Sequence, residues 1–220
     1  LAREVRSGDK VAKALHELLE RLLPHFEAGQ LAHTLDMSDA EAELIKGLHL
    51  LSMKPVLYVC NRKSGALNLD EQNDERWQEL LEFFEKNGAE YVVVDAGVEH
   101  ELKDLNEDEK NEFRREYGTQ DSGIDSLIRA CYRRLGLMSY FTTGEKETRA
   151  WTVKQGSTGP EAGAAIHTDF KDKYIRAQVV AYNDLITAGS RTAAKDAGKV
   201  RTEGKEYIVQ DGDVIEFMHS

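Results

Sequence analysis

Two short apolar runs, separated by one helix-sized segment, constrain the fold of this chain more than any other feature. The runs are Pro55–Cys60 and Tyr91–Val94, and neither alternates apolar with polar side chains. Unbroken apolar runs of this length are typical of strands in a parallel sheet, where both faces are covered. The segment between them ends at Asn87-Gly88 and has apolar residues at helical spacing: Trp77, Leu80, Leu81 and Phe84. The sequence therefore predicts a β-α-β unit whose two parallel strands are buried on both faces.

Helical patterns flank this unit. Over residues 9–27 apolar side chains recur three, four and seven positions apart, which predicts an amphipathic helix that needs a packing partner. Ser38 followed by Glu41 is a capping-box pattern and predicts a second helix over residues 39–48. Two further helices are expected, one begun by the pair Asn106 and Glu109 and one over residues 124–135 that stops at Gly136.

After Gly136 the sequence has short strand patterns in place of the alternating strands and helices. They lie at residues 137–142, 148–153, 174–182, 207–210 and 214–217, with helical material between them. Asp211-Gly212-Asp213 contains the turn dipeptide Asp-Gly, which predicts a hairpin between the last two strands. We therefore expect a separate α+β domain after a boundary near Gly136.

Charge is distributed unevenly along the chain. The formal net charge of −11 argues against a protein that coats nucleic acid over its whole surface. Residues 70–121 hold eighteen Asp and Glu against six Lys and Arg, whereas residues 171–205 hold eight Lys and Arg against four acidic residues. We interpret the acidic stretch from Glu99 to Glu116 as a solvated helix face, and any basic surface should be C-terminal.

The two cysteines indicate a reducing compartment. Cys60 and Cys131 both lie in apolar runs, which favours buried thiols over a secreted disulfide framework and over reactive nucleophiles. No apolar run approaches the roughly 20 residues needed to span a bilayer, and no signal segment opens the sequence. We expect a cytoplasmic protein that does not enter a membrane. Because Leu1 leads directly into helical sequence, we also expect the natural protein to start upstream.

Three ordered segments carry a family resemblance. They are Ser139–Val153, Ala165–Phe170 and Glu206–Val214, and together they resemble the C-terminal signature of the Obg-like ATPases, the YchF group of the TRAFAC P-loop GTPase superfamily. The second segment with a late Asp-Gly-Asp is also similar to the TGS domains of threonyl-tRNA synthetases and stringent-response enzymes. The resemblance implies a β-grasp, ubiquitin-like TGS domain over residues 137–220.

The resemblance extends upstream of this domain. Leu51–Asn61 looks like the strand that leads to the base-recognition motif of the family's nucleotide-binding domain, and the opening helix resembles the returning half of its antiparallel helical arm. This implies a helical, coiled-coil arm segment at 1–48 and the C-terminal part of a parallel-sheet, P-loop-type nucleotide-binding domain at 49–136. The family's amino-terminal half has no counterpart in this sequence.

The chain lacks the motif that binds nucleotide phosphates. A G-x-x-x-x-G-K-[ST] loop cradles phosphate with its backbone amides, and this sequence has none. The nearest glycine cluster, Gly156–Gly159, lacks the Lys and is interpreted as a loop and helix start. The resemblance implies that complete members bind ATP with Mg²⁺, hydrolyse it in preference to GTP and act near the ribosome. This chain alone is expected to be inactive.

Half of a base site is present. The base-recognition motif of guanine-specific relatives is Asn-Lys-x-Asp, and that of the Obg-like ATPases is usually Asn-x-x-Glu. In this chain the corresponding residues are Asn61-Arg62-Lys63-Ser64. The resemblance assigns Asn61, Arg62 and, in the matching loop after the next strand, Ala96 to nucleotide binding. Their place at the carboxyl end of parallel strands supports a ligand site. The alternative is that Asn61 only ends a strand, and Ser64 in place of a carboxylate argues against guanine discrimination.

The C-terminal cations are the candidate RNA or partner contacts: Lys171, Lys173, Arg176, Arg191, Lys195 and Lys199. Solvation explains such charges in most domains, but TGS domains are associated with RNA and ribosome-linked proteins. Tyr174 and Tyr182 are either stacking platforms for bases or core residues of a strand. His167 and Asp169 lack the ligand count and spacing of a metal site, so no metal site is expected.

Two functions remain open at this level. The chain is either the C-terminal portion of a ribosome-associated ATPase or a non-catalytic module that binds RNA, ribosome or protein through its TGS domain. Because two strands and one helical stripe would leave apolar surface uncovered, we expect this chain to self-associate or partly unfold in isolation.

Overall fold

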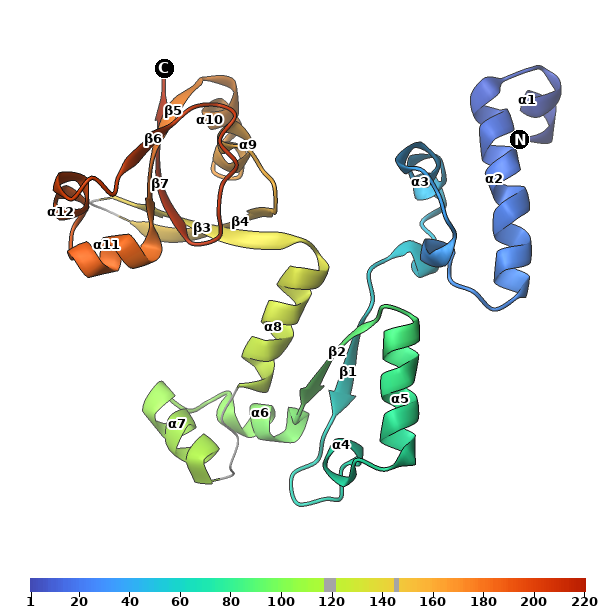
Figure 1. Cartoon of the computed structure of the whole chain (residues 1–220), viewed down its shortest axis with the longest axis horizontal. Coiled ribbons are helices and arrows are strands. Elements are labelled where there is room, and N and C mark those ends of the chain that lie inside the picture. Colours follow the sequence, from blue (N-terminus) through green and yellow to red (C-terminus); the bar gives the residue numbers. More distant parts are fainter. Residues whose placement is uncertain (117–121, 145–146) are drawn as a thin grey trace. The chain divides into compact units, whose positions relative to one another are not determined.

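The computed structural model describes residues 1–116, 122–144 and 147–220, and it divides into two compact units, Leu1–Val56 and Leu57–Ser220 (Figure 1). No helix within these ranges is long and apolar enough to cross a membrane. The three-part domain division expected from the sequence stays a prediction.

The first unit is helical. Its longest helix, α2 (Lys10–Glu27), begins where the Asp9 carboxylate accepts the N–H groups of Val11 and Ala12. The predicted amphipathic stripe is confirmed, because Leu18 and Leu22 are buried within the unit's core. The other elements are α1 (Ala2–Arg6), α3 (Asp39–Ile45) and the 3₁₀ turns η1 (Ala32–Thr34), η2 (Lys46–Leu48) and η3 (Leu51–Met53).

The predicted capping box starts α3. The Ser38 hydroxyl accepts the Glu41 N–H at 3.3 Å, and the Glu41 carboxylate accepts the Ser38 N–H at 2.8 Å. The α-helix ends at Ile45, three residues earlier than predicted, because the chain tightens into η2. His49 then leaves the helical conformation at a positive φ of 51°.

The second unit begins with the predicted β-α-β arrangement. Strands β1 (Leu57–Asn61) and β2 (Glu90–Val94) are parallel, with Leu57 opposite Glu90 and Asn61 opposite Val94. Between them lie α4 (Leu69–Gln72) and α5 (Glu75–Lys86), and after them α6 (Ala96–Leu102), α7 (Glu107–Glu116) and α8 (Gly123–Arg134).

Two helices cover opposite faces of this two-stranded sheet. Phe84 of α5 stacks on Tyr91 with ring centroids 4.6 Å apart, whereas Ala130 of α8 packs against Val92 and Val94. Successive strand residues point to opposite faces, so α5 and α8 lie on different sides.

The expectation that both strands are fully buried is wrong for β1. None of its five residues is buried, and Val59 is 50% exposed. Among the described residues this sheet has two strands, so each strand keeps one edge without a strand partner there, and the helices cover only part of each face. An unbroken apolar run therefore identifies the parallel strand correctly but overstates how much of it is covered.

Five strands form a mixed sheet in the rest of the second unit, in the order β4-β3-β7-β5-β6. The central pair β3·β7 is parallel, with Phe141 opposite Val214, and the other pairs are antiparallel. This is the strand order of a β-grasp sheet, so the predicted mixed α/β and α+β fold is confirmed. The bounds are β3 (Leu137–Thr143), β4 (Thr148–Lys154), β5 (Tyr174–Ala181), β6 (Arg201–Glu203) and β7 (Asp213–His219).

Helices pack on both faces of this sheet. On one face, Tyr140, Val179 and Ile215 are buried with Ala162 of α9 (Gly159–Ala164), and α10 (Thr168–Asp172) lies beside it. The Tyr140 hydroxyl donates to the Ala162 carbonyl at 2.8 Å. On the other face, Val180 and Val214 pack with α11 (Tyr182–Ala188) and α12 (Arg191–Asp196).

The predicted hairpin between the last two strands is wrong. Strands β6 and β7 pair with opposite edges of β5, and residues 207–210 do not form a strand. The Asp-Gly turn docks on β3 instead. The Asp211 carboxylate accepts the Ser139 N–H at 2.8 Å, and the Gly212 N–H donates to the Ser139 carbonyl at 2.8 Å. These bonds guide the chain into β7 alongside β3.

Candidate functional site

The predicted base-site residues Asn61 and Ala96 meet in the structure. Asn61 ends β1 and Ala96 begins α6, and the Asn61 side-chain carbonyl accepts the Ala96 N–H at 3.0 Å. The neighbouring Asp95 caps the same helix by accepting the N–H groups of Gly97 and Val98 at 3.1 and 3.0 Å. Because both strand ends lie at the carboxyl edge of a parallel pair, these groups occupy the usual ligand-binding edge of an α/β sheet.

The third base-site candidate, Arg62, is held by acidic side chains. Its guanidinium forms an ion pair with Asp70 at 3.4 Å and a hydrogen bond with Glu71. Hydrogen bonding by Asn68 and the charge of Arg62 hold the pKa of Glu71 below its ordinary value. Arg62 thus positions the loop that follows β1 and is not a free cation for a ligand.

Asn68 closes that loop. Its side-chain oxygen accepts the Lys63 N–H at 2.9 Å, and its side-chain nitrogen donates to the Lys63 carbonyl at 3.1 Å. The position that holds a carboxylate in related motifs is Ser64, which is exposed. The amide nitrogen of Asn61 can therefore donate a hydrogen bond to a nucleobase. Ser64 has no carboxylate that could accept one.

Burial raises the pKa of the Cys60 thiol beside this site, and the charge of Asp70 adds to that shift. Cys60 and Cys131 are both free and half-buried, so neither thiol is as fully buried as its apolar run predicts. Within the described ranges, no three His, Cys, Asp or Glu side chains gather into a group that could hold a metal ion.

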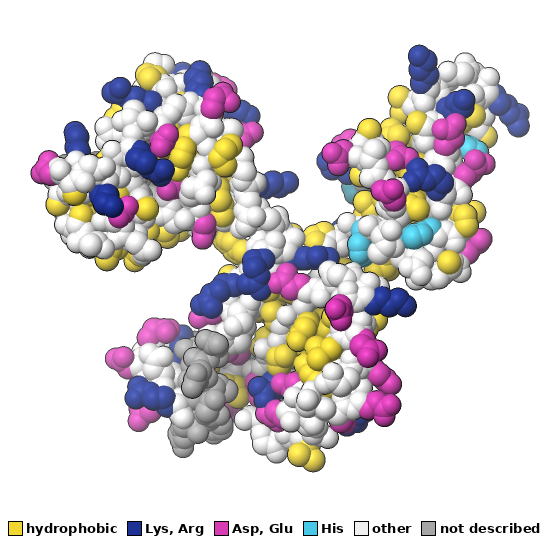
Figure 2. Space-filling model, viewed as in Figure 1, with side chains coloured by type: hydrophobic (Ala, Val, Ile, Leu, Met, Phe, Trp, Pro, Cys, Tyr) yellow, Lys and Arg dark blue, Asp and Glu magenta, His cyan; other side chains and the backbone are white. Residues whose placement is uncertain are grey.

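The six candidate cations of the C-terminal domain lie on several separate elements. One group lies on α10 and the start of β5, and the other lies on α12 and the residues after it: Lys171, Lys173 and Arg176 in the first, Arg191, Lys195 and Lys199 in the second. Figure 2 shows basic and acidic side chains interspersed over this domain. On the face drawn there, the excess of Lys and Arg along the sequence does not form a continuous basic surface.

Most of these cations already have partners. Lys173 pairs with Asp169 at 3.3 Å, Arg191 with Glu216 at 3.1 Å, and Lys199 with Asp184 at 3.3 Å. The Arg176 Nε donates to the Met218 sulfur at 3.2 Å. Among the described residues, Lys171 and Lys195 have no ion pair within 4 Å, so they are the freest of the six.

A buried polar network in this domain does not follow from the sequence patterns. Asp213 is 3% exposed, and its carboxylate accepts the Tyr207 hydroxyl at 2.6 Å and the Gln210 N–H at 2.9 Å. Arg201 lies 3.6 Å from the same carboxylate and donates to the Tyr207 oxygen at 3.0 Å. The Asp-Gly-Asp motif is the one sequence pattern near this network, but by itself it predicts only a turn.

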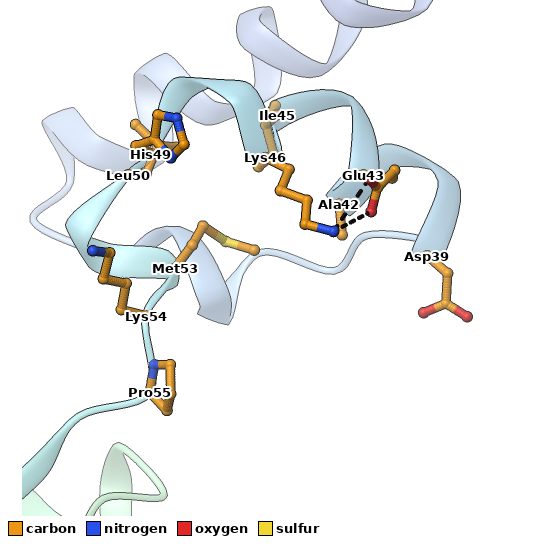
Figure 3. Close-up of a pocket in the computed structure, with 10 residues that line it drawn as sticks. All are labelled: Asp39, Ala42, Glu43, Ile45, Lys46, His49, Leu50, Met53, Lys54 and Pro55. Carbon is orange, nitrogen blue, oxygen red and sulfur yellow. Dashed lines mark hydrogen bonds and ion pairs between the residues drawn. The ribbon is translucent and has the colours of Figure 1, made fainter. Parts of the chain in front are cut away.

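The first unit contains a groove that the sequence also did not reveal. It has a volume of about 530 Å³ and is lined by apolar side chains such as Ile45, Leu50 and Met53, with Lys46 and Glu43 paired at its rim (Figure 3). Met53 extends into it. Asp39, His49 and Lys54 also line the groove, so it combines apolar contact with ionisable side chains.

Known proteins resemble this chain over its C-terminal domain and over nearly its whole length. A family model described as YchF-GTPase_C, protein of unknown function, matches residues 137–220. The "Ribosome-binding ATPase YchF" of Bacillus subtilis (strain 168) is 45% identical over 212 residues, which is 96% of this chain and 58% of that protein. The protein of the same name from Escherichia coli O157:H7 is 40% identical over 216 residues, 98% of this chain and 58% of that protein.

A solved structure gives the same result for the fold. The Schizosaccharomyces pombe YchF GTPase superimposes with a TM-score of 0.79 at 29% identity, over 92% of this chain and 53% of that chain. The chain thus spans somewhat more than half the length of the relatives that it matches.

Proposed function

Because the chain belongs to the YchF family of Obg-like ATPases, matching the C-terminal portion of its members, we propose that it is part of a ribosome-associated ATPase. The observation that carries the nucleotide half of this proposal is the hydrogen bond between Asn61 and Ala96 at the carboxyl end of the parallel strands. In this proposal, residues 1–48 are a helical arm segment, 49–136 the base-recognising end of a nucleotide-binding domain, and 137–220 a TGS domain.

The same hydrogen bond supports a preference for ATP over GTP. Guanine presents a carbonyl oxygen where adenine presents an amino group. The Ala96 N–H is already donated to Asn61, so it is not free for that carbonyl, and Ser64 supplies no carboxylate for the N–H groups of guanine. A guanine bound here would leave polar groups unpaired, which is the strongest basis for rejecting a ligand.

Phosphate and Mg²⁺ would be held by parts of the complete protein other than this chain. The sequence has no Walker-type loop to supply the backbone amides, Lys and hydroxyl that this chemistry requires. The Asn61 amide N–H groups fit the N1, N3 and N7 ring nitrogens of adenine, which are acceptors. We therefore assign base recognition to this chain and ATP hydrolysis only to the complete cytoplasmic protein.

The experiment compares the complete protein with the 220-residue chain. We expect ATP turnover that exceeds GTP turnover in the complete protein and no turnover by this chain alone. A complete protein that hydrolyses GTP as fast as ATP would contradict the assigned base preference, and one that hydrolyses neither would remove the enzyme assignment.

A second candidate function is a non-catalytic module that binds RNA or ribosome through residues 137–220. The names of the relatives include ribosome binding, and Lys171 and Lys195 are exposed cations without ion pairs among the described residues. The test is fluorescence anisotropy with ribosomal RNA across a salt series. We expect Lys171→Glu with Lys195→Glu to weaken binding and flatten its salt dependence, whereas Lys199→Glu, whose lysine is already paired with Asp184, should have a smaller effect.

A further inference from the structure

A hollow beside Tyr182 lies at the end of the C-terminal sheet where β5 leads into α11. It has a volume of about 240 Å³ and is lined by Phe141, Ala181, Tyr182, Asn183, Asp211 and Gly212. Pockets for drug-sized ligands are typically about 300–1,000 Å³, so this one suits a single flat ring system better than a large ligand.

The structure separates the two tyrosines that the sequence left undecided. Tyr174 is 3% exposed, with its hydroxyl 3.4 Å from the Glu203 and Gly204 carbonyls, so it is a core residue. Tyr182 is 48% exposed and lies with its ring centroid 5.8 Å from that of Phe141, at an interplanar angle of 40°. Phe141 packs against the buried cluster of Val180 and Val214, which holds this aromatic wall in place.

Polar groups at the rim of the hollow match the edge of a base. The Asp211 Oδ1 accepts the Ser139 N–H at 2.8 Å, and its other oxygen has no hydrogen-bond partner within the described ranges. The Asn183 side chain is exposed and, among the same residues, also unpaired. An aromatic face with a carboxylate and an amide beside it can stack a base and accept hydrogen bonds from an exocyclic amino group.

The charges nearby are largely compensated. Lys199 neutralises Asp184 at 3.3 Å, and Arg201 lies 3.6 Å from the buried Asp213. These four residues line a second hollow that shares Ala181 and Asp211 with the first. Affinity at this place would therefore come from stacking and hydrogen bonds more than from phosphate contacts.

We propose that the hollow formed by Phe141, Tyr182, Asn183 and Asp211 receives one unpaired RNA base that carries an exocyclic amino group. The inference rests on the proposed ribosome contact, because it names the surface and the kind of RNA involved. The base stacks on Tyr182, and Asp211 accepts its amino group. Adenine, cytosine and guanine carry such a group, whereas uracil has carbonyl oxygens and no exocyclic amino group.

The test is fluorescence anisotropy of the 220-residue chain with labelled poly-A, poly-C and poly-U. We expect poly-A and poly-C to bind more tightly than poly-U. Tyr182→Ala should weaken poly-A binding by roughly 5- to 100-fold, the range expected for losing one base stacked on an aromatic ring. Tyr182→Phe keeps the ring and should bind like the original chain, and neither change should alter the salt dependence.

A second variant tests the hydrogen bond independently. Asp211→Asn keeps the oxygen that holds Ser139 but replaces the free acceptor with a donor, so the preference should shift from poly-A toward poly-U. Circular dichroism melting shows whether each variant is folded.

The outcomes separate this inference from the function on which it rests. If the unaltered chain binds neither ribosomal RNA nor the homopolymers, the RNA-binding proposal itself fails. If it binds RNA but Tyr182→Ala binds equally well, or if folded Asp211→Asn keeps the original preference, the hollow is not the base receptor. Displacement of poly-A by equimolar adenosine monophosphate would overturn RNA as the source of the base.

Discussion

The Tyr207 hydroxyl donates a hydrogen bond to the buried carboxylate of Asp213 at 2.6 Å, which ties the segment before the last turn to the start of β7. Burial raises the pKa of Tyr207 to about 12, and the hydrogen bond and negative charge of Asp213 add to the shift. The ordinary value is 10.0, so the unfolded chain loses this proton first as pH rises.

Folding stability should therefore fall as pH rises from about 10 to about 12, because the folded state retains a proton that the unfolded state has released. Below pH 10 this contribution is fully present. Tyr207→Phe should reduce the slope of the free energy of unfolding against pH in that window, measured by urea denaturation. Tyr182→Phe, at an exposed position, is the control, and an equal change in both variants would contradict the assignment.

The approach of Gly159 to Tyr174 predicts an overpacking effect. A Cβ at Gly159 would lie 2.6 Å from the Tyr174 hydroxyl oxygen, in a buried place where the ring cannot swing away. Gly159→Ala should destabilise the chain by about 1–3 kcal/mol, measured by urea denaturation.

A double-mutant cycle tests the cause of that loss. Tyr174→Phe removes the atom nearest to the added methyl, so it should make Gly159→Ala less costly. Gly204→Ala is the matched control, since nothing lies within 4 Å of its added Cβ. Strict additivity of Gly159→Ala and Tyr174→Phe would show that the destabilisation has another origin.

Two variants of Asn61 separate its hydrogen bond to Ala96 from its contact with the base at the proposed base site. Asn61→Ala removes the acceptor of the Ala96 N–H and should lower stability by about 0.5–1.5 kcal/mol. Asn61→Asp keeps an acceptor but loses the side-chain donor. In the complete protein, Asn61→Asp should therefore preserve the melting temperature yet weaken ATP binding roughly tenfold. Equal ATP affinity in the original protein and Asn61→Asp would exclude Asn61 as a base contact.

Exposed apolar side chains predict self-association of this chain. Val11, Leu23 and Val59 are 63%, 61% and 50% exposed, respectively. Analytical ultracentrifugation should show dimers or larger species, and Leu23→Glu with Val59→Thr should shift the distribution toward monomer. A cooperatively melting monomer at all concentrations would contradict this expectation.

The sequence predicted those features that depend on local patterns. The apolar runs identified β1 and β2, and the pair Ser38 and Glu41 located the start of α3, because strand runs and caps are determined by neighbouring residues. The meeting of Asn61 with Ala96 followed from one rule, that the ends of adjacent parallel strands share an edge.

Features set by distant contacts were less accessible. The Asp-Gly turn predicts a hairpin because its local signal is strong, but Asp211 is held by Ser139, seventy-two positions away. Cations that adjoin in the sequence were expected to form one surface, whereas the structure places them on different elements and pairs two of them with Asp184 and Glu216. No local pattern shows which acidic side chain a given Lys or Arg will meet.

Co-sedimentation of the 220-residue chain with purified bacterial ribosomes tests the proposed ribosome contact most directly. We predict that the chain pellets with ribosomes at low salt, and that Lys171→Glu with Lys195→Glu and, separately, Tyr182→Ala reduce the pelleted fraction without unfolding the chain. A folded chain that stays in the supernatant at every salt concentration would contradict the assignment of residues 137–220 as the ribosome-contacting domain.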